Sequence, residues 1–136
     1  WFDMPMTLKE HQSRALFDAI KKYQPDCLIN SRLGNGAYDY VSLGDNEIPD
    51  SMPENTEFDP ALMNGIDGFK PSPAATINRT WGFSAHDQNW KSPEIIAANR
   101  KKLNGMGINY LLNVGPDGLG RIPLASQKVL REAAKL

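Results

Sequence analysis

Four places in this sequence put a polar or aromatic side chain where an apolar, strand-like run ends. They are Asp3 after Trp1-Phe2, Asn30 with Arg32 after the run that begins at Cys27, Trp81, and Asn113. If the strands are parallel, their carboxyl ends meet at one edge of a sheet, where the following loops build the sites of α/β enzymes. A carboxylate, an amide, a guanidinium and an indole gathered there could bind a polar ligand and act on it. We therefore expect one site built from several strand ends.

The segments that would position these side chains alternate between helix and strand patterns. Apolar residues recur at helical spacing over residues 8–23, after a capping-box pattern that begins at Thr7, and Pro25 ends this helix. A second helix is predicted at residues 93–104 behind the N-cap Ser92, and a final helix includes Leu124 and Ala133. Strands are predicted at residues 27–30, 38–41, 75–81 and 108–114. This alternation predicts an α/β fold in which helices cover a parallel sheet.

Charge and hydropathy exclude two classes of partner. The 15 Lys and Arg residues and 16 Asp and Glu residues give a net charge of -1 and are interspersed, so we expect no nucleic-acid partner. No apolar stretch approaches the ~20 residues of a membrane helix, so we expect no membrane partner. Cys27 is the single cysteine and cannot form an internal disulfide, which predicts a buried thiol in a reducing, cytoplasmic compartment.

Six blocks of sequence carry a family resemblance. In chain order they are WFD, INSRLGNG, DYVSLGDNEIP, TINRTWGF, NWKS and NYLLNVGPDGLGRIP. Together, from Trp1 to Pro123, they resemble the α-L-fucosidases of glycoside hydrolase family 29, in that family's order and near its spacings. The resemblance is nearest to short bacterial members that act on α-1,6-linked fucose. It implies an irregular (β/α)8 barrel and a retaining hydrolase that removes terminal α-L-fucose through a covalent fucosyl-enzyme.

The resemblance implies that Asp3 is the nucleophile and that Arg32 binds the sugar. A retaining glycosidase needs a fixed, ionised carboxylate against the anomeric carbon, and the several donors of a guanidinium suit hydroxyl recognition. Each residue also has a purely structural interpretation. Asp3 could cap a nearby backbone group, and Arg32 could pair with Asp39 or Glu47.

Trp81 matches an aromatic residue near the fucose ring in relatives, where an apolar face can cover the sugar's C–H groups. A core tryptophan is the alternative. Asn30, in the same block as Arg32, is predicted to contribute to substrate binding. His11 and His86 have no acidic or cysteine partners at ligand spacing, so we predict no metal, and carboxylates and water suffice for the chemistry, so we predict no cofactor.

The general acid/base is the point at which the sequence departs from its relatives. Family members often supply a glutamate a few residues before the TIN block, but no acid lies between Asp67 and Thr76 here. Asp45 in GDNEIP stands where other branches of the family carry their acid, and Glu47 is a weaker candidate. A catalytically silent fucose-binding or scaffold module is therefore the alternative function. A flavodoxin-like binding protein is disfavoured because no anion-binding glycine loop is present.

Length sets the expected domain organisation. A barrel of this type needs ~250 residues, and the chain has 136. We therefore expect residues 1–136 to form one partial catalytic domain, the C-terminal half of the barrel from about the fourth strand to the last helix, with no second domain. The expected partners are a fucosylated oligosaccharide or glycoconjugate, and either the remainder of the barrel or an oligomer partner that covers the exposed strand edges.

Overall fold

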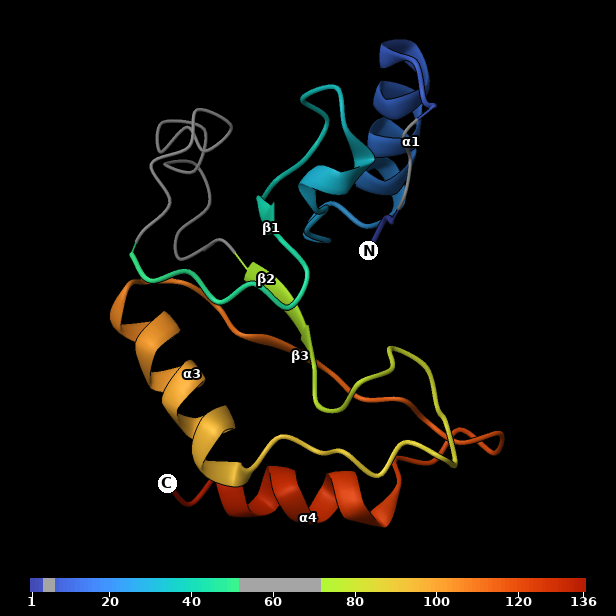
Figure 1. The fold of residues 1–136 in the computed structure, drawn as a ribbon. Helices are drawn as coiled ribbons and strands as arrows, with labels where there is room; N and C mark the ends of the chain where they lie inside the picture. Colours follow the sequence, from blue (N-terminus) through green and yellow to red (C-terminus); the bar gives the residue numbers. More distant parts are fainter. Residues whose placement is uncertain (4–6, 52–71) are drawn as a thin grey trace. The chain divides into compact units, whose positions relative to one another are not determined.

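The computed structural model describes residues 1–3, 7–51 and 72–136. The chain falls into two compact units. The described residues of unit 1 lie within Trp1–Ser42, and those of unit 2 lie within Leu43–Met52 and Ser72–Leu136 (Figure 1). Each unit is described by itself.

Unit 1 is built around helix α1 (Glu10–Tyr23). The helix begins at Glu10 instead of residue 8, and its N-cap is Lys9, so the prediction of a cap at Thr7 is wrong. The reason is local: the Lys9 N–H donates to the side-chain oxygen of Gln12 at 2.8 Å, which caps the first turn from within the helix. Three buried residues, Ile29, Leu33 and Ala37, form the core that α1 helps to cover.

The predicted strand at residues 27–30 is wrong, because only Asn30 makes a strand-like bridge, in parallel with Tyr40. The Asp39 carboxylate accepts the Ile29 N–H at 2.8 Å, and the Asp39 N–H donates to the Ile29 carbonyl at 2.8 Å. A side chain thus takes the place of a backbone ladder partner. Cys27 is exposed, so the expected buried thiol is also wrong. The 3-10 helix η1 (Ser31–Leu33) follows directly.

Unit 2 contains a parallel βαβ arrangement. Strand β2 (Ser72–Thr76), helix α3 (Pro93–Gly105) and strand β3 (Leu111–Asn113) follow one another, and β2 pairs with β3 in parallel with Thr76 opposite Asn113. Strand β1 (Ser42–Leu43), where the chain passes from unit 1 to unit 2, is the other neighbour of β2 in the strand order. The described residues therefore combine helices with a few short strands, two of them parallel, as an α/β fold requires.

Strand β2 ends at Thr76, although the pattern predicted a strand to residue 81. The Thr76 hydroxyl lies 3.0 Å from the Asn78 carbonyl oxygen and 3.1 Å from the Thr80 carbonyl oxygen, so it draws the following residues into a turn. Where the strand pattern continued, the chain therefore becomes a loop.

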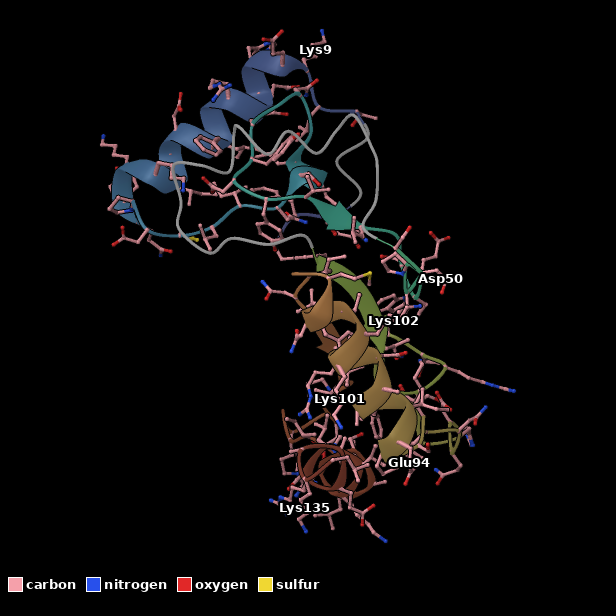
Figure 2. The ribbon with its side chains drawn as sticks, turned by 90° about the vertical axis from the view of Figure 1, so that its left-hand side faces the viewer. Lys9, Asp50, Glu94, Lys101, Lys102 and Lys135 are labelled. Atoms are coloured by element: carbon pink, nitrogen blue, oxygen red, sulfur yellow. The ribbon has the colours of Figure 1, made fainter. Side chains whose placement is uncertain are left out.

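The two later helices are confirmed, since α3 ends one residue beyond its prediction and α4 spans Leu124–Ala133. The start of α3 lies against the end of α4 in Figure 1, and their shared core contains the buried Ile77, Ile96 and Ala133. Figure 2 shows Lys102 on α3 near Asp50, with the Nζ and Oδ1 atoms 2.6 Å apart. Among the described helices, none combines the length and apolarity needed to cross a membrane.

Replacing Asp39 with Ala should destabilise the protein. Asp39 is buried, with 8% of its side chain exposed. Its carboxylate accepts the Ile29 N–H and forms an ion pair with Lys21 at 2.9 Å. Removing it leaves a buried N–H without its acceptor, which costs about 1–3 kcal/mol. Denaturant unfolding of the full-length protein would measure the change, with Asp18→Ala on the exposed face of α1 as the control. Equal unfolding midpoints for the two variants would contradict this account.

Candidate functional site

Two of the charged residues predicted for the site, Asp3 and Arg32, meet in unit 1. Arg32 Nη1 lies 2.8 Å from Asp3 Oδ1, with 21% of the Arg32 side chain and 57% of the Asp3 side chain exposed. The guanidinium is therefore recessed, while the carboxylate remains accessible. The suggested Arg32–Asp39 pair does not form, because Asp39 instead pairs with Lys21.

Several neighbours hold the Arg32 side chain. Its Nε donates to the Ser42 hydroxyl at 3.2 Å, and the Ser42 N–H donates to the Ser31 hydroxyl at 2.9 Å. The Arg32 guanidinium carbon lies 5.2 Å from the centroid of the Trp1 ring, within the range of a cation–π contact. The Ser42 hydroxyl and the Trp1 ring thus help to hold the guanidinium where it meets Asp3.

Asn30 acts on this site through the backbone. Its side chain is completely buried, and its amide makes two hydrogen bonds with Phe2: Oδ1 accepts the Phe2 N–H and Nδ2 donates to the Phe2 carbonyl, both at 2.9 Å. This pairing resembles that of a neighbouring strand. Since Phe2 directly precedes Asp3, the amide sets where the carboxylate emerges from the chain.

The candidate acids Asp45 and Glu47 lie in unit 2, on an exposed turn. Between them, Asn46 adopts a left-handed backbone with φ of 56°. Its N–H donates to the Ala74 carbonyl at 2.7 Å, and its side-chain oxygen accepts the Thr76 N–H at 2.9 Å. The turn is therefore fastened to β2 at the residue next to Asp45.

Glu47 is the less favourable of the two candidates. Its carboxylate folds back over Gly44, so closely that a Cβ added at Gly44 would lie 2.4 Å from Glu47 Oε2. Of the stretch without an acid between Asp67 and Thr76, the first half, up to Pro71, lies outside the described residues, and the second half belongs to β2.

Trp81 also lies in unit 2, and 42% of it is exposed, so it is not a core residue. Its carbonyl accepts a hydrogen bond from the Asn113 side chain at 2.7 Å, which ties the loop after β2 to the end of β3. The tryptophan of this unit that packs against the core is the half-buried Trp90, whose indole N–H donates to the Ser126 hydroxyl at 2.9 Å. Sequence reasoning did not single out Trp90.

Asp87 is a further residue that the sequence analysis missed. Its side chain is nearly buried, and Oδ2 accepts the N–H groups of Arg79 at 2.8 Å and Thr80 at 3.0 Å, while Oδ1 accepts that of Asn89 at 3.1 Å. Burial raises the pKa of Asp87, but these hydrogen bonds, with one from the Thr80 hydroxyl, outweigh it and hold the pKa below its usual value. The one signal in the sequence for Asp87 was an aspartate followed by polar loop residues. This pattern is common, so it did not distinguish Asp87 from other loop aspartates.

Lys91 lies at the base of the same loop. Its ammonium group donates to the Thr76 carbonyl, and burial lowers the pKa of its amine. Within residues 1–3, 7–51 and 72–136, no three His, Cys, Asp or Glu side chains are grouped so that they could hold a metal ion.

Comparison with known proteins gives one family. Residues 1–136 match a family model described as Alpha-L-fucosidase. Among solved structures, the chain is 52% identical to the α-L-fucosidase AlfC from Lactobacillus casei in complex with α-L-fucose, with a TM-score of 0.80 over 99% of this chain and 38% of that one. A variant of AlfC in complex with Fucα(1,6)GlcNAc gives 51% identity and a TM-score of 0.79 over 99% of this chain and 37% of that one.

A more distant similarity is to α-L-fucosidase isoenzyme 1 from Paenibacillus thiaminolyticus, with 27% identity and a TM-score of 0.76 over 99% of this chain and 32% of that one. A comparison with curated protein sequences found no match. The chain spans well under half the length of each of these solved relatives.

Asp87→Asn should make unfolding less dependent on pH in the acid range. The hydrogen bonds that lower the Asp87 pKa stabilise the fold above ~3.9, the ordinary Asp pKa, and this contribution is lost as pH falls through the lowered value. Thermal unfolding of the full-length protein between pH 7 and pH 3 should show a lower midpoint for the variant at pH 7 and a narrowing difference on acidification. The exposed Asp26→Asn variant controls for loss of charge, and a constant difference at all pH values would contradict the assignment.

Proposed function

This chain belongs to the α-L-fucosidase family, whose members are glycoside hydrolases, and we propose that it carries part of the active site of a retaining α-L-fucosidase. The observation that carries the proposal is the accessible Asp3 carboxylate held 2.8 Å from Arg32. The proposed substrate is a terminal α-L-fucose, α-1,6-linked to N-acetylglucosamine in an oligosaccharide or glycoconjugate. The AlfC complex with Fucα(1,6)GlcNAc supports this choice of linkage.

We propose that residues 1–136 form one catalytic domain, the C-terminal half of an irregular (β/α)8 barrel. The parallel pairing of β2 with β3 across α3 supports this architecture, because a barrel is built from repeated βα units. The extent of the match supports this architecture too, since nearly the whole chain matches AlfC but covers 38% of AlfC's length. The remaining strands of the barrel are the partner that this half requires.

In the proposed mechanism, Asp3 attacks the anomeric carbon and forms a covalent fucosyl-enzyme. Arg32 holds Oδ1 of the carboxylate, which directs the other oxygen toward the sugar. The leaving oxygen takes a proton as the glycosidic bond breaks, and water later releases fucose with the same anomeric configuration. Arg32 also binds a sugar hydroxyl through the fork of donors that its contact with Ser42 keeps in place.

Asp45 is the proposed general acid/base, with Glu47 as the alternative. Asp45 lies on an exposed turn that Asn46 fastens to β2, while the Glu47 carboxylate folds over Gly44. A retaining enzyme has its two carboxyl groups ~5–5.5 Å apart, a requirement that any candidate for the acid/base has to meet. Trp81 offers an exposed indole face for the C–H groups of the fucose ring.

Asp3→Gly should abolish hydrolysis of 4-nitrophenyl α-L-fucoside by the full-length protein, with kcat reduced by about 10³-fold or more because the covalent step is lost. Added azide should restore turnover and yield β-L-fucosyl azide, since a small anion can occupy the space of the missing carboxylate and attack the same face. Turnover at the unmodified rate in the variant would exclude Asp3 as the nucleophile. Binding of fucose by the unmodified protein without any hydrolysis would instead indicate the silent module.

Asp45→Asn should lower the activity on two kinds of substrate by different amounts. The variant should lose about 10²–10⁴-fold in kcat/KM on the α-1,6-linked fucosyl-N-acetylglucosamine disaccharide, whose leaving group needs a proton, and much less on the 4-nitrophenyl fucoside, whose leaving group needs little. Glu47→Gln is the matched control from the same turn and should leave both rates near those of the unmodified protein. The reverse pattern would assign the acid to Glu47.

A further inference from the structure

Resting on the proposed function, we propose that Lys91 is a positioning residue for Asp45, the proposed general acid/base, because its ammonium group holds the end of β2 to which the Asp45 turn is fastened. The last residue of β2, Thr76, makes both contacts. Its N–H donates to the side chain of Asn46, the neighbour of Asp45, at 2.9 Å. Its carbonyl accepts the Lys91 ammonium group. Two hydrogen bonds to one residue thus connect Lys91 with the turn that carries the acid.

The backbone of Lys91 is fixed on both sides, so its side chain reaches Thr76 from a rigid support. Its N–H donates to the Ile77 carbonyl at 2.8 Å, and Lys91 therefore contacts two consecutive carbonyls where β2 ends. The next residue, Ser92, is the N-cap of α3. The preceding residue, Trp90, is bonded to α4 through its indole N–H. The support of the ammonium group thus belongs to the packed helices of unit 2, and rigid elements position site residues better than loops do.

The charge of Lys91 is unfavourable for stability alone. In the part of the chain that the structure describes, no carboxylate forms an ion pair with its half-buried ammonium group. Burial costs a charged group free energy, and it lowers the pKa of this amine accordingly. In return, a hydrogen bond from a cation to a carbonyl is stronger than one from a neutral donor. A cation that lies at this strand end in spite of the cost therefore indicates a need to hold Thr76 firmly.

The position of Thr76 matters because the acid depends on it. A general acid must lie within hydrogen-bond reach of the leaving oxygen. The turn that carries Asp45 is exposed, and Asn46 ties it to β2 at the Ala74 carbonyl and the Thr76 N–H. A shift of Thr76 is therefore passed to Asp45 through a single residue, and a misplacement of ~1 Å can cost about 10²-fold in rate.

The test compares kcat/KM of the full-length protein on the α-1,6-linked fucosyl-N-acetylglucosamine disaccharide and on 4-nitrophenyl α-L-fucoside. Lys91→Met removes the ammonium group and keeps a long side chain. It should lower kcat/KM about tenfold or more on the disaccharide, whose leaving group needs a proton, and about twofold or less on the aryl fucoside. Lys91→Arg keeps a charged donor and should retain more activity on the disaccharide. Lys101→Met, the same change at an exposed position on α3 (Figure 2), is the control and should alter neither value.

A double variant shows whether Lys91 acts through Asp45. In Asp45→Asn the acid is already lost, so adding Lys91→Met should lower kcat/KM on the disaccharide by a further twofold or less, about the limit of additivity for independent sites. A further tenfold loss would mean that Lys91 acts elsewhere, and it would overturn the inference. Thermal unfolding measures the folded fraction of each variant. If Lys91→Met does not fold, Lys91→Gln, which keeps a neutral donor, replaces it with the same expected pattern.

The outcomes separate this inference from the proposed function. A parallel loss on both substrates would mean that Lys91 supports only the fold or the fucose site, and it would overturn the inference, as would no loss on either substrate. The fucosidase activity would stand in both cases. Equal losses on both substrates in Asp45→Asn would place the acid elsewhere, and the inference would fail with that assignment. If the unmodified protein cleaved neither substrate, the proposed function itself would fail.

Discussion

The two hydrogen bonds between the Asn30 amide and the Phe2 peptide group determine where Asp3 lies. They exclude Asn30 from solvent and give residues 1–3 a strand-like partner without a strand. Arg32 is two residues beyond Asn30, so the same short segment fixes the backbone that precedes the carboxylate and supplies the cation that holds it. The nucleophile proposed here must be fixed in position and yet accessible, and this arrangement would meet both requirements.

The same physical device recurs elsewhere in the described chain. A side-chain oxygen accepts a backbone N–H where a strand neighbour would otherwise be. In unit 1 the Asp39 side chain accepts the Ile29 N–H, and in unit 2 the Asn46 side chain accepts the Thr76 N–H. Asp87 does the same for three N–H groups of one loop. Short polar side chains of this kind satisfy buried donors and also end the ladder, which accounts for strands of two, three and five residues.

These hydrogen bonds from the backbone to side chains also explain which elements could be predicted from the sequence and which could not. The helices were predictable because a period of 3.6 residues survives any local hydrogen bond, and α3 and α4 follow their patterns closely. The strand predicted at residues 27–30 and the part of the predicted strand 75–81 that lies beyond Thr76 failed because Asp39 and Thr76 compete for the backbone, and composition does not reveal such competition. The partner of Arg32 was undecidable among several carboxylates, since only the folded chain brings Asp3 to it. Likewise, the three tryptophans look alike in sequence, and packing alone distinguishes Trp90, which lies against the core, from the exposed Trp81.

The two candidate carboxylates occupy different environments, as a retaining mechanism requires of a nucleophile and an acid. Asp3 is paired with the recessed guanidinium of Arg32, whereas Asp45 lies on a turn that is anchored through the neighbouring residue Asn46. The left-handed backbone of Asn46 costs about 1–3 kcal/mol if unsupported, and the bonds to Ala74 and Thr76 offset that cost. Because Asn46 carries the anchoring contacts, the Asp45 side chain can stay exposed at the edge of the sheet. A residue that gives up a proton and later takes one from water needs that exposure.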